Sequence, residues 1–486
     1  MDDQAVRSVP WTISTFVAQR AIPMLTTIVL ARILAPSDFG LVAMAGVVMG
    51  VLGILVDFGM QNTIVMRRDL SVRAQGTVLS MMLLLSGGAA MLGAALSPVV
   101  ALAYGEARVA PIMAALSGVF LVMGVNSFYD GVLQREMAFR SRFGAQMVNT
   151  AVYSVTVLVL ALSGAGVWSL VIGQLLGAAA CFLAMLIVVP YRVRPRFDRR
   201  TAADTFATSR GFLMQGGMAF LQQNADNAIV GRVLGPQALG FYSMAYRLGE
   251  LPTLAISNPV ARVTFSEFSR MREQGRSLGL AFLKVLRMVA LVACPVGVIV
   301  SALAEPLVAT VLGPQWGPAA GPIAVLGIWS AFYPVQNTLN WMINSVGRAS
   351  LLALVSGVVL VFFLGGAVGA AAWAGTTAVA VAVLGRTVVT VVASAVLVRR
   401  HTEVGLRAQA RALTPVAAGC IVAWPAAHFA LLALEHEPAG LALVGGALAG
   451  GLAYVVAAVL MDRDLAGQTV EQLRRVAGRP VAPVTS

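Results

Sequence analysis

The chain has 486 residues, of which 58% are hydrophobic and only 11% are charged, and its mean hydropathy is +0.84. Soluble proteins carry about 25% charged residues, so this chain lacks the polar surface that a water-soluble protein of its length needs. The composition excludes a soluble enzyme or binding module and predicts an integral membrane protein. The formal net charge is +13, but the basic residues lie in short loops, so no nucleic-acid partner is expected.

Apolar runs follow one another along almost the whole chain, and each is long enough to cross a bilayer as a helix of about 20 residues. They show no period of two, which excludes transmembrane β-strands and makes the fold class all-α. About fourteen transmembrane helices are expected, at residues 11–34, 40–66, 77–103, 111–133, 144–163, 166–189, 210–234, 240–265, 283–304, 319–345, 349–371, 373–398, 414–434 and 440–461.

The loops between these helices alternate in charge. Arginines gather in every second loop, as at 67–73, 135–142, 192–200 and 399–411, whereas the intervening loops are short and carry almost no positive charge. Basic loops face the cytoplasm and lie beside anionic lipid headgroups. The alternation therefore predicts an even number of spans with both the N- and the C-terminus in the cytoplasm.

Cysteine and histidine usage gives no sign of a metal centre. Cys181, Cys294 and Cys420 all lie inside apolar runs, and the three histidines show no metal-ligand spacing. Cysteines in such runs are small core residues. We therefore expect no disulfide framework, no metal site and no cofactor.

One segment occurs twice. Residues 32–40, Arg-Ile-Leu-Ala-Pro-Ser-Asp-Phe-Gly, recur as Arg-Val-Leu-Gly-Pro-Gln-Ala-Leu-Gly at 232–240. Each copy ends one apolar run and opens the next, and Pro and Gly suit a tight turn between helices. Six predicted spans separate the copies, and this even number places both on the same side of the membrane.

Two six-helix bundles related as parallel repeats follow from this spacing. The predicted parts are 1–205 with helices one to six, 206–400 with helices seven to twelve, and 401–486 with an appended helix pair and a cytoplasmic tail. Two such bundles are a transporter architecture, in which the substrate site lies between the halves near the bilayer midplane and access alternates.

Polar side chains inside the predicted spans are the candidate site residues. A charge at the bilayer centre costs about 2.5–3.5 kcal/mol and needs a partner or a wet cavity. The candidates are Arg20, Asp57, Gln222, Asn224, Asp226, Arg247, Glu250, Asn337 and Asn340. Two structural alternatives stay open: Arg247 and Glu250 are placed to pair with each other, and the asparagines are placed to join helices by hydrogen bonds.

Several of these residues lie in stretches that resemble a known family. The stretches are 30–41, 57–60 with 67–70, 224–247, 259–265 and 312–316. Over about residues 10–400 the chain resembles the polysaccharide transporter branch of the multidrug/oligosaccharidyl-lipid/polysaccharide exporter superfamily. That branch includes the Wzx-type oligosaccharide flippases, and the colanic-acid exporter type is the nearest in appearance.

The resemblance implies a MATE-like fold and a flippase. Its cargo would be an undecaprenyl-diphosphate-linked oligosaccharide, moved across the bacterial inner (plasma) membrane for exopolysaccharide, capsule or O-antigen synthesis. The partners implied are this lipid-linked oligosaccharide, membrane lipids, and the polysaccharide polymerase and chain-length machinery.

The resemblance also suggests roles for the candidates. Arg20 and Arg247 would bind the diphosphate, because a guanidinium grips phosphate through two parallel hydrogen bonds. The amides that would bind sugar hydroxyls are Gln222, Asn224, Asn337 and Asn340. Asp57, Asp226 and Glu250 would either carry a coupling ion, H⁺ or Na⁺, or hold the arginines, and the sequence does not separate these two roles.

Two other functions are alternatives for a membrane protein of this composition. A membrane polymerase or ligase of lipid-linked glycans needs a large external loop with catalytic groups, but the largest external loop, 305–318, holds one acid and no His or Arg. We therefore expect a transporter and not an enzyme. A lipid II exporter or small-molecule exporter of the same superfamily would share the fold and differ in cargo.

Overall fold

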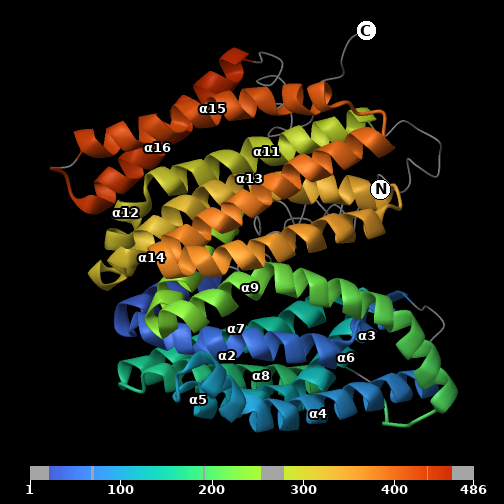
Figure 1. Cartoon of the computed structure of the whole chain (residues 1–486). Helices are drawn as coiled ribbons and strands as arrows, with labels where there is room; N and C mark the ends of the chain where they lie inside the picture. The colour runs from blue at the N-terminus through green and yellow to red at the C-terminus, as the bar shows by residue number, and fades with distance from the viewer. Residues whose placement is uncertain (1–20, 67–70, 190–191, 253–278, 435, 462–486) are drawn as a thin grey trace. The chain divides into compact units, whose positions relative to one another are not determined.

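The computed structural model describes residues 21–66, 71–189, 192–252, 279–434 and 436–461, and every regular element in these ranges is a helix (Figure 1). The predicted all-helical fold class is confirmed. The chain divides into two compact units. The first unit runs to Ser243 and includes Ala367–Thr376, and the second comprises Met244–Gly366 and the residues from Thr377 onward. The boundaries expected at 205 and 400 follow the repeat and stay predictions.

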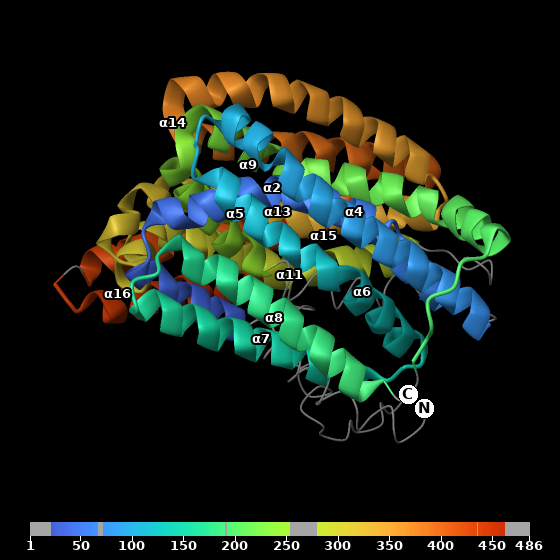
Figure 2. The ribbon, with the colours of Figure 1, turned by 90° about the horizontal axis from the view of Figure 1, so that it is seen from below.

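The first unit begins with a helix at Ala21–Ile33. It continues with α2 (Pro36–Asp57), α3 (Met60–Met66), α4 (Val72–Tyr104), α5 (Val109–Leu116), η1 (Ser117–Val119), α6 (Phe120–Arg135), α7 (Phe139–Leu162), α8 (Val167–Val188) and most of α9 (Arg199–Pro252). Figure 2 shows α7 and α8 running alongside each other, in agreement with their contacts. A core of buried side chains joins α3, α4, α6 and α8, with Ile64, Met82 and Phe128 at its centre.

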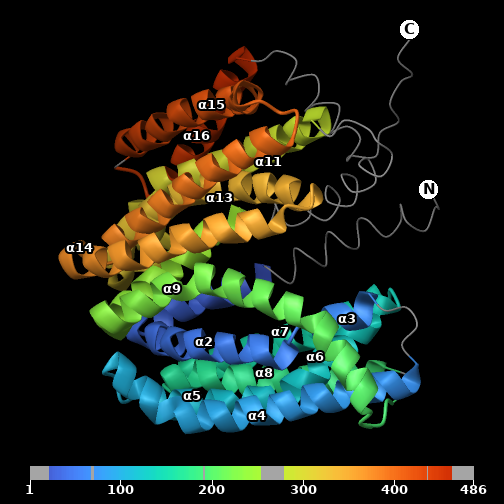
Figure 3. The same ribbon diagram turned by 45° about the vertical axis from the view of Figure 1, so that its right-hand side comes forward.

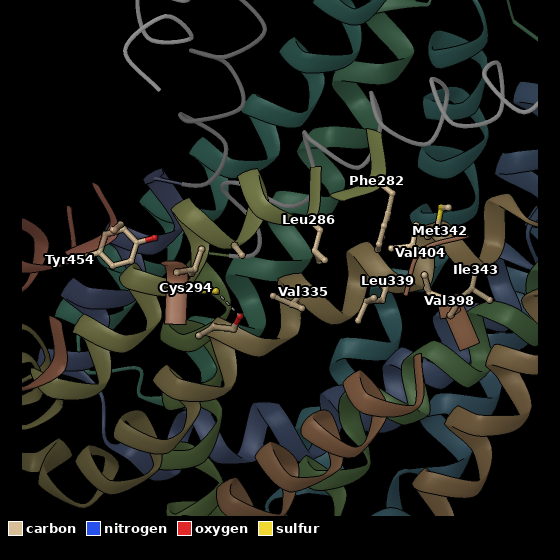
Figure 4. Close-up of a cluster of buried hydrophobic side chains, with 14 of the residues drawn as sticks. Phe282, Leu286, Cys294, Val335, Leu339, Met342, Ile343, Val398, Val404 and Tyr454 are labelled. Carbon is tan, nitrogen blue, oxygen red and sulfur yellow. Dashed lines mark hydrogen bonds between the residues drawn. The ribbon is translucent and has the colours of Figure 1, made fainter. Parts of the chain in front are cut away.

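The second unit holds the end of α9 and the elements α11 (Gly279–Ala302), α12 (Ala304–Leu307), η3 (Val308–Leu312), η4 (Pro314–Ala319), α13 (Ala320–Ser345), most of α14 (Ala349–His401), α15 (Leu406–Ala433) and α16 (Ala439–Met461). In Figure 3, α15 and α16 lie side by side, and they are in contact. The core of this unit joins α11, α13, α14, α15 and α16 (Figure 4).

Small residues let the helices of the second unit approach closely. A Cβ atom built on Gly297 of α11 would lie 2.6 Å from the carbonyl oxygen of Gly327 on α13, so neither position has room for a larger residue. Helices inside a bilayer gain little from the hydrophobic effect and associate through close packing of this kind. The Gly and Ala content of the sequence thus serves helix packing.

Ten helices in the described ranges are long and apolar enough to cross a membrane, and the structure does not confirm the predicted number of fourteen. Two predicted gaps between spans appear as kinks inside longer helices. α9 bends at Gly235, whose φ is 83°, and α14 bends at Gly375, whose φ is 70°. Glycine has no Cβ to oppose a positive φ, so the chain turns there without strain.

The predicted helix 40–66 is interrupted. α2 ends at Asp57, Phe58 takes a left-handed conformation with φ of 45°, and α3 starts at Met60. A positive φ is unusual for an aromatic residue. The signs of a break in the sequence are Gly59, directly after Phe58, and the polar residues Asp57 and Gln61 on either side. The consequence is a discontinuous helix with Asp57 at the joint.

The two copies of the repeated motif meet within the first unit. A Cβ atom on Gly40 would collide with the carbonyl group of Pro236, and one on Gly240 would collide with the carbonyl group of Pro36. The contact is reciprocal, as in an interface between two symmetry-related subunits. Both motifs therefore lie at the same end of the helices, as the even spacing of six spans predicts.

Candidate functional site

A cavity of about 610 Å³ lies inside the first unit, between α2, α5, α6, α8 and α9. One face of α2 supplies Gly46, Gly50 and Gly53, whose spacing of four and three residues places them on the same side of a helix. Gly46 has no atom within 4 Å of where a Cβ would lie. The absence of a side chain at Gly46 therefore leaves open space in the cavity.

The remaining wall of the cavity is mostly apolar. From the other helices the lining side chains are Leu116, Val119, Phe120, Met123, Gln174, Leu213 and Phe220. The Phe220 ring of α9 packs directly against Gly50, where a Cβ atom would collide with it. Among the lining residues, Asp57 and Gln174 are the two with polar side chains.

Asp57 lies at the break between α2 and α3. Its carboxylate faces the backbone N–H groups of Gln61 and Gly59, while the Oδ1 atom is buried and has no hydrogen-bond partner among the described residues. A buried acceptor without a partner costs about 1–3 kcal/mol or more when it is charged. The break thus places a carboxylate with spare bonding capacity on the wall of an apolar cavity.

A buried polar cluster lies beyond the break. Asp130 on α6 accepts hydrogen bonds from Arg142 on α7, with Nε to Oδ1 at 2.7 Å and Nη2 to Oδ2 at 2.8 Å. Gln146 Nε2 donates to the same carboxylate at 3.0 Å, and Gln61 Nε2 on α3 donates at 2.6 Å. The four side chains tie three helices together, and Gln61 connects the cluster to the break because it belongs to the first turn of α3.

This cluster is not among the candidates that the sequence suggests. Asp130 lies inside the predicted span 111–133, and Arg142 lies in a predicted basic loop. An acid inside a predicted span, twelve positions before an arginine at the start of the next, was the available signal.

Asp226 on α9 has a different environment from Asp57. It is fully buried, and the Tyr242 hydroxyl donates to its Oδ2 atom at 2.6 Å. The backbone N–H of Asn227 donates to its Oδ1 atom at 2.9 Å. Asp226 and Tyr242 lie on opposite sides of the kink at Gly235, so their bond holds the two arms of α9 together.

The other candidates are distributed over both units. Gln222 and Asn224 lie half-buried on α9, where the Asn224 amide donates to the Phe220 carbonyl at 3.1 Å. Arg247 is exposed and Glu250 is half-buried near the end of α9. Arg20 lies outside the described residues.

Helix α13 carries the two asparagine candidates. Asn337 and Asn340 are half-buried, and the Asn340 side-chain oxygen accepts from the Ser394 hydroxyl on α14 at 3.0 Å. One turn before Asn337, the Tyr333 ring stacks on Trp329 at 4.8 Å, and Tyr246 packs on Trp329 at 4.9 Å. Asn340 thus joins α13 to α14, while Asn337 lies next to an aromatic stack.

The amino-acid sequence is similar to those of several named bacterial proteins. Succinoglycan biosynthesis transport protein ExoT of Rhizobium meliloti (strain 1021) is 26% identical over 96% of this chain and 95% of its own length. Teichuronic acid biosynthesis protein TuaB of Bacillus subtilis (strain 168) is 24% identical over 64% of this chain and 65% of its own. Lipopolysaccharide biosynthesis protein WzxC of Escherichia coli (strain K12) is 20% identical over 72% and 71%.

Solved structures share the fold. A lipid II flippase MurJ in an inward closed conformation superposes with a TM-score of 0.74 at 13% identity, over 93% of this chain and 99% of that one. An inward-facing MATE family transporter of the MOP superfamily gives a TM-score of 0.63 at 16% identity, over 78% and 94%. The predicted MATE-like, multi-pass membrane fold is confirmed.

A family model described as "Polysaccharide biosynthesis protein" matches residues 29–321, which is more than half of the chain. The matched range contains both copies of the repeated motif, the interrupted helix at Asp57 and the Asp226–Tyr242 pair. The resemblance drawn from the sequence is confirmed, and the chain belongs to the polysaccharide biosynthesis protein family of membrane transporters.

Proposed function

We propose that this chain is a flippase that moves an undecaprenyl-diphosphate-linked oligosaccharide across the bacterial inner membrane for cell-surface polysaccharide synthesis. The proposal rests on two observations together: the family to which the chain belongs and the fold that it shares with a flippase. The relatives are named for succinoglycan, teichuronic acid and lipopolysaccharide biosynthesis, and the fold is that of a lipid II flippase over 93% of the chain.

Transport and not catalysis is the activity that we propose. The segment 305–318, where a glycan polymerase would carry its reactive groups, forms α12, η3 and part of η4. Leu312 and Trp316 are fully buried in the fold. A segment that is packed in this way supports a structural role, and alternating access between two parallel repeats is the mechanism that fits the fold.

Asp57 is the acid that we propose for ion coupling. Its free Oδ1 atom and its place on the cavity wall leave it able to bind and release a cation as the chain changes conformation. Discontinuous helices of this kind commonly form ion and substrate sites in transporters. Asp226 is bonded to Tyr242, and we assign it to holding the bend of α9.

The substrate-binding residues that we propose are Arg20 and Arg247 for the diphosphate, and the amides for the sugars. The exposure of Arg247 supports its role, because a guanidinium with open donors can grip phosphate. We also propose that both termini are cytoplasmic and that the flipped glycan is delivered to the polymerase and chain-length machinery.

The experiment that tests this function is mass analysis of membrane lipids after deletion of the gene from its host. Undecaprenyl-diphosphate-linked oligosaccharide should accumulate, and a plasmid copy of the wild-type gene should remove it. Accumulation of lipid II instead would assign the lipid II cargo. A membrane-lipid profile that does not change would contradict the flippase assignment.

Complementation with variants tests the coupling assignment separately. Asp57→Asn, which keeps the shape of the side chain and removes its charge, should abolish or strongly reduce export while the protein still inserts. Gln174→Leu changes the other polar lining residue and serves as the matched control. Full export by the Asp57→Asn variant would remove Asp57 from coupling and leave the flippase assignment standing.

A further inference from the structure

The connection between α8 and α9 has a backbone that hydrogen bonds hold against α4. Residues 192–198, here called the arginine strap, run without helix or turn from the end of α8 to the start of α9. Arg196 N donates to the Gly76 carbonyl at 3.2 Å, Ser80 Oγ donates to the Arg196 carbonyl at 2.9 Å, and Asp198 N donates to Thr77 Oγ1 at 3.3 Å. In Figure 2 the strap passes beside the N-terminal end of α4.

Two further features fix the strap in place. Val193 is buried and belongs to the core of the first unit. A Cβ atom on Gly76 would lie 2.6 Å from the Arg194 carbonyl oxygen, so only glycine lets the strap lie this close to α4. The backbone is therefore anchored at both edges, and its charged side chains are directed away from the core.

The charge of this surface is strongly positive. The exposed arginines of the strap, of the first turn of α9 and of the adjoining end of α4 are Arg73, Arg192, Arg194, Arg196, Arg199 and Arg200. Asp198 is the acid in the strap. Its Oδ2 atom accepts hydrogen bonds from the backbone N–H and the hydroxyl of Thr201, at 2.8 and 2.7 Å. In the described part of the chain none of the six arginines forms an ion pair.

The strap lies where membrane-spanning helices end. The candidate spans Val167–Val188 and Arg73–Tyr104 both end near it, so in a bilayer that these helices cross the strap would lie near the lipid headgroups. Phe197 of the strap is 60% exposed, and Phe206, two turns into α9, is 52% exposed. Exposed aromatic rings among arginines are typical of protein surfaces that lie in the headgroup region.

We propose that the arginine strap binds the phosphate headgroups of anionic phospholipids in the leaflet that the basic loops face. Residues two apart on an extended backbone are separated by about 6.6 Å. Arg192, Arg194 and Arg196 thus present a row of separate cations that matches several neighbouring phosphates in a lipid surface better than one compact diphosphate. The proposal does not depend on the cargo that the protein carries.

The test compares lipid binding by the full-length wild-type protein and a strap variant, Arg194→Gln/Arg196→Gln/Arg199→Gln. Each protein is reconstituted in nanodiscs of phosphatidylcholine with 20% phosphatidylglycerol or cardiolipin, extracted, and analysed by native mass spectrometry for retained lipid. Each arginine that is removed should weaken binding about fivefold, because one basic residue near an anionic surface contributes about 1 kcal/mol. The triple variant should therefore retain anionic lipid about 100-fold less strongly.

A matched control removes the same charge elsewhere. Arg399→Gln/Arg400→Gln/Arg407→Gln changes three exposed arginines of another predicted basic loop, and it should leave the high-affinity retention within about twofold. Equal losses in the two variants, or no loss in the strap variant, would overturn the proposal. Thermal unfolding of both variants in detergent identifies any variant that is not folded. If the triple strap variant is not folded, the single variants Arg194→Gln and Arg196→Gln replace it, and each should weaken retention about fivefold.

A competition arm distinguishes the source of the phosphate. Undecaprenyl diphosphate, added at equal concentration to wild-type protein in phosphatidylglycerol nanodiscs, should not displace the lipid held by the strap. Displacement that the strap variant abolishes would overturn the phospholipid assignment and assign the strap to the diphosphate.

Discussion

Gly40 and Gly240, two hundred residues apart in sequence, occupy equivalent places in one reciprocal contact. Each glycine lies against the carbonyl group of the proline in the middle of the other motif, and a Cβ atom on Gly40 would lie 3.0 Å from the Gly240 nitrogen. Because backbone atoms form the contact, no side-chain rotation can relieve an added methyl group.

The first prediction concerns stability. Gly40→Ala and Gly240→Ala should each destabilise the protein by about 1–3 kcal/mol, the usual cost of overpacking, because the backbones of the two motifs must separate. Gly46→Ala is the matched control, since its Cβ would meet open space, and should have little effect. Thermal unfolding in detergent measures all three, and equal midpoints for the Gly40 and Gly46 variants would contradict the contact.

The second prediction concerns sidedness. Single cysteines at Ser37 and Gln237, one in each motif, should both react with a membrane-impermeant maleimide applied to the outside of intact cells, because the motifs lie together and follow an odd number of predicted spans. Reaction of one from outside and of the other only after lysis would mean that the repeats are inverted. A cysteine at Arg407, in a predicted cytoplasmic loop, is the control that should stay unlabelled in intact cells.

The third prediction concerns the Asp130–Arg142 pair. Asp130→Asn leaves the Arg142 guanidinium without its anion and should destabilise the protein by about 3 kcal/mol. This value is the lower end of the range for a broken buried pair, and we choose it because 26% of the Arg142 side chain is exposed. The double variant Asp130→Asn/Arg142→Gln should lose less than the sum of the single variants.

The exposed pair Arg108–Glu106, at 2.9 Å with 60% of the Arg108 side chain exposed, is the control for the buried one. Exposed pairs contribute about 0–1 kcal/mol, so Arg108→Gln should shift thermal unfolding much less than Asp130→Asn. Similar shifts for the two variants would show that the Asp130 cluster does not hold the helices.

The fourth prediction concerns pH at the start of α9. The hydrogen bonds from the Thr201 side chain and backbone lower the pKa of Asp198 from its ordinary 3.8. A carboxyl group with a lowered pKa stabilises the folded state above its ordinary pKa, and this contribution is lost as the pH falls through the lowered value. Amide exchange at Thr201, corrected for intrinsic rate, should therefore accelerate below about pH 3.8 in the wild-type protein.

Asp198→Asn keeps a side-chain acceptor and does not titrate. Its exchange at Thr201 should show no such acid transition. An acid transition of the same size in this variant would assign the change to another group.

The elements that depend on hydropathy and spacing were predictable from the sequence. The repeat at 32–40 and 232–240 identified two turns between helices, which the structure places in contact with each other. The kink at Gly235 falls in an expected gap between spans, and the kink at Gly375 lies a few residues beyond one. These features follow from local composition, because Pro and Gly end helices wherever they occur in this arrangement.

The site was harder to predict because it depends on tertiary neighbours. Hydropathy does not determine the left-handed backbone at Phe58 and Gly59. The cavity is lined by three glycines of α2, of which Gly46 faces open space while Gly50 lies against the Phe220 ring. Asp57 and Asp226 look alike in the sequence, but in the structure Asp57 lines the cavity with an unbonded Oδ1 atom whereas Asp226 accepts a hydrogen bond from the Tyr242 hydroxyl. Asp130 finds its partner on the next helix, which no count of charges per span reveals.

The glycines along α2 have a consequence for how this protein can change over generations. The cavity narrows by one methyl group when the Gly46 codon mutates to an alanine codon, and that methyl group meets no neighbour, whereas one at Gly50 would collide with the Phe220 ring. The change at Gly46 leaves the helix packing intact. The volume of the cavity can therefore change by single-nucleotide substitutions while the helices around it keep their packing.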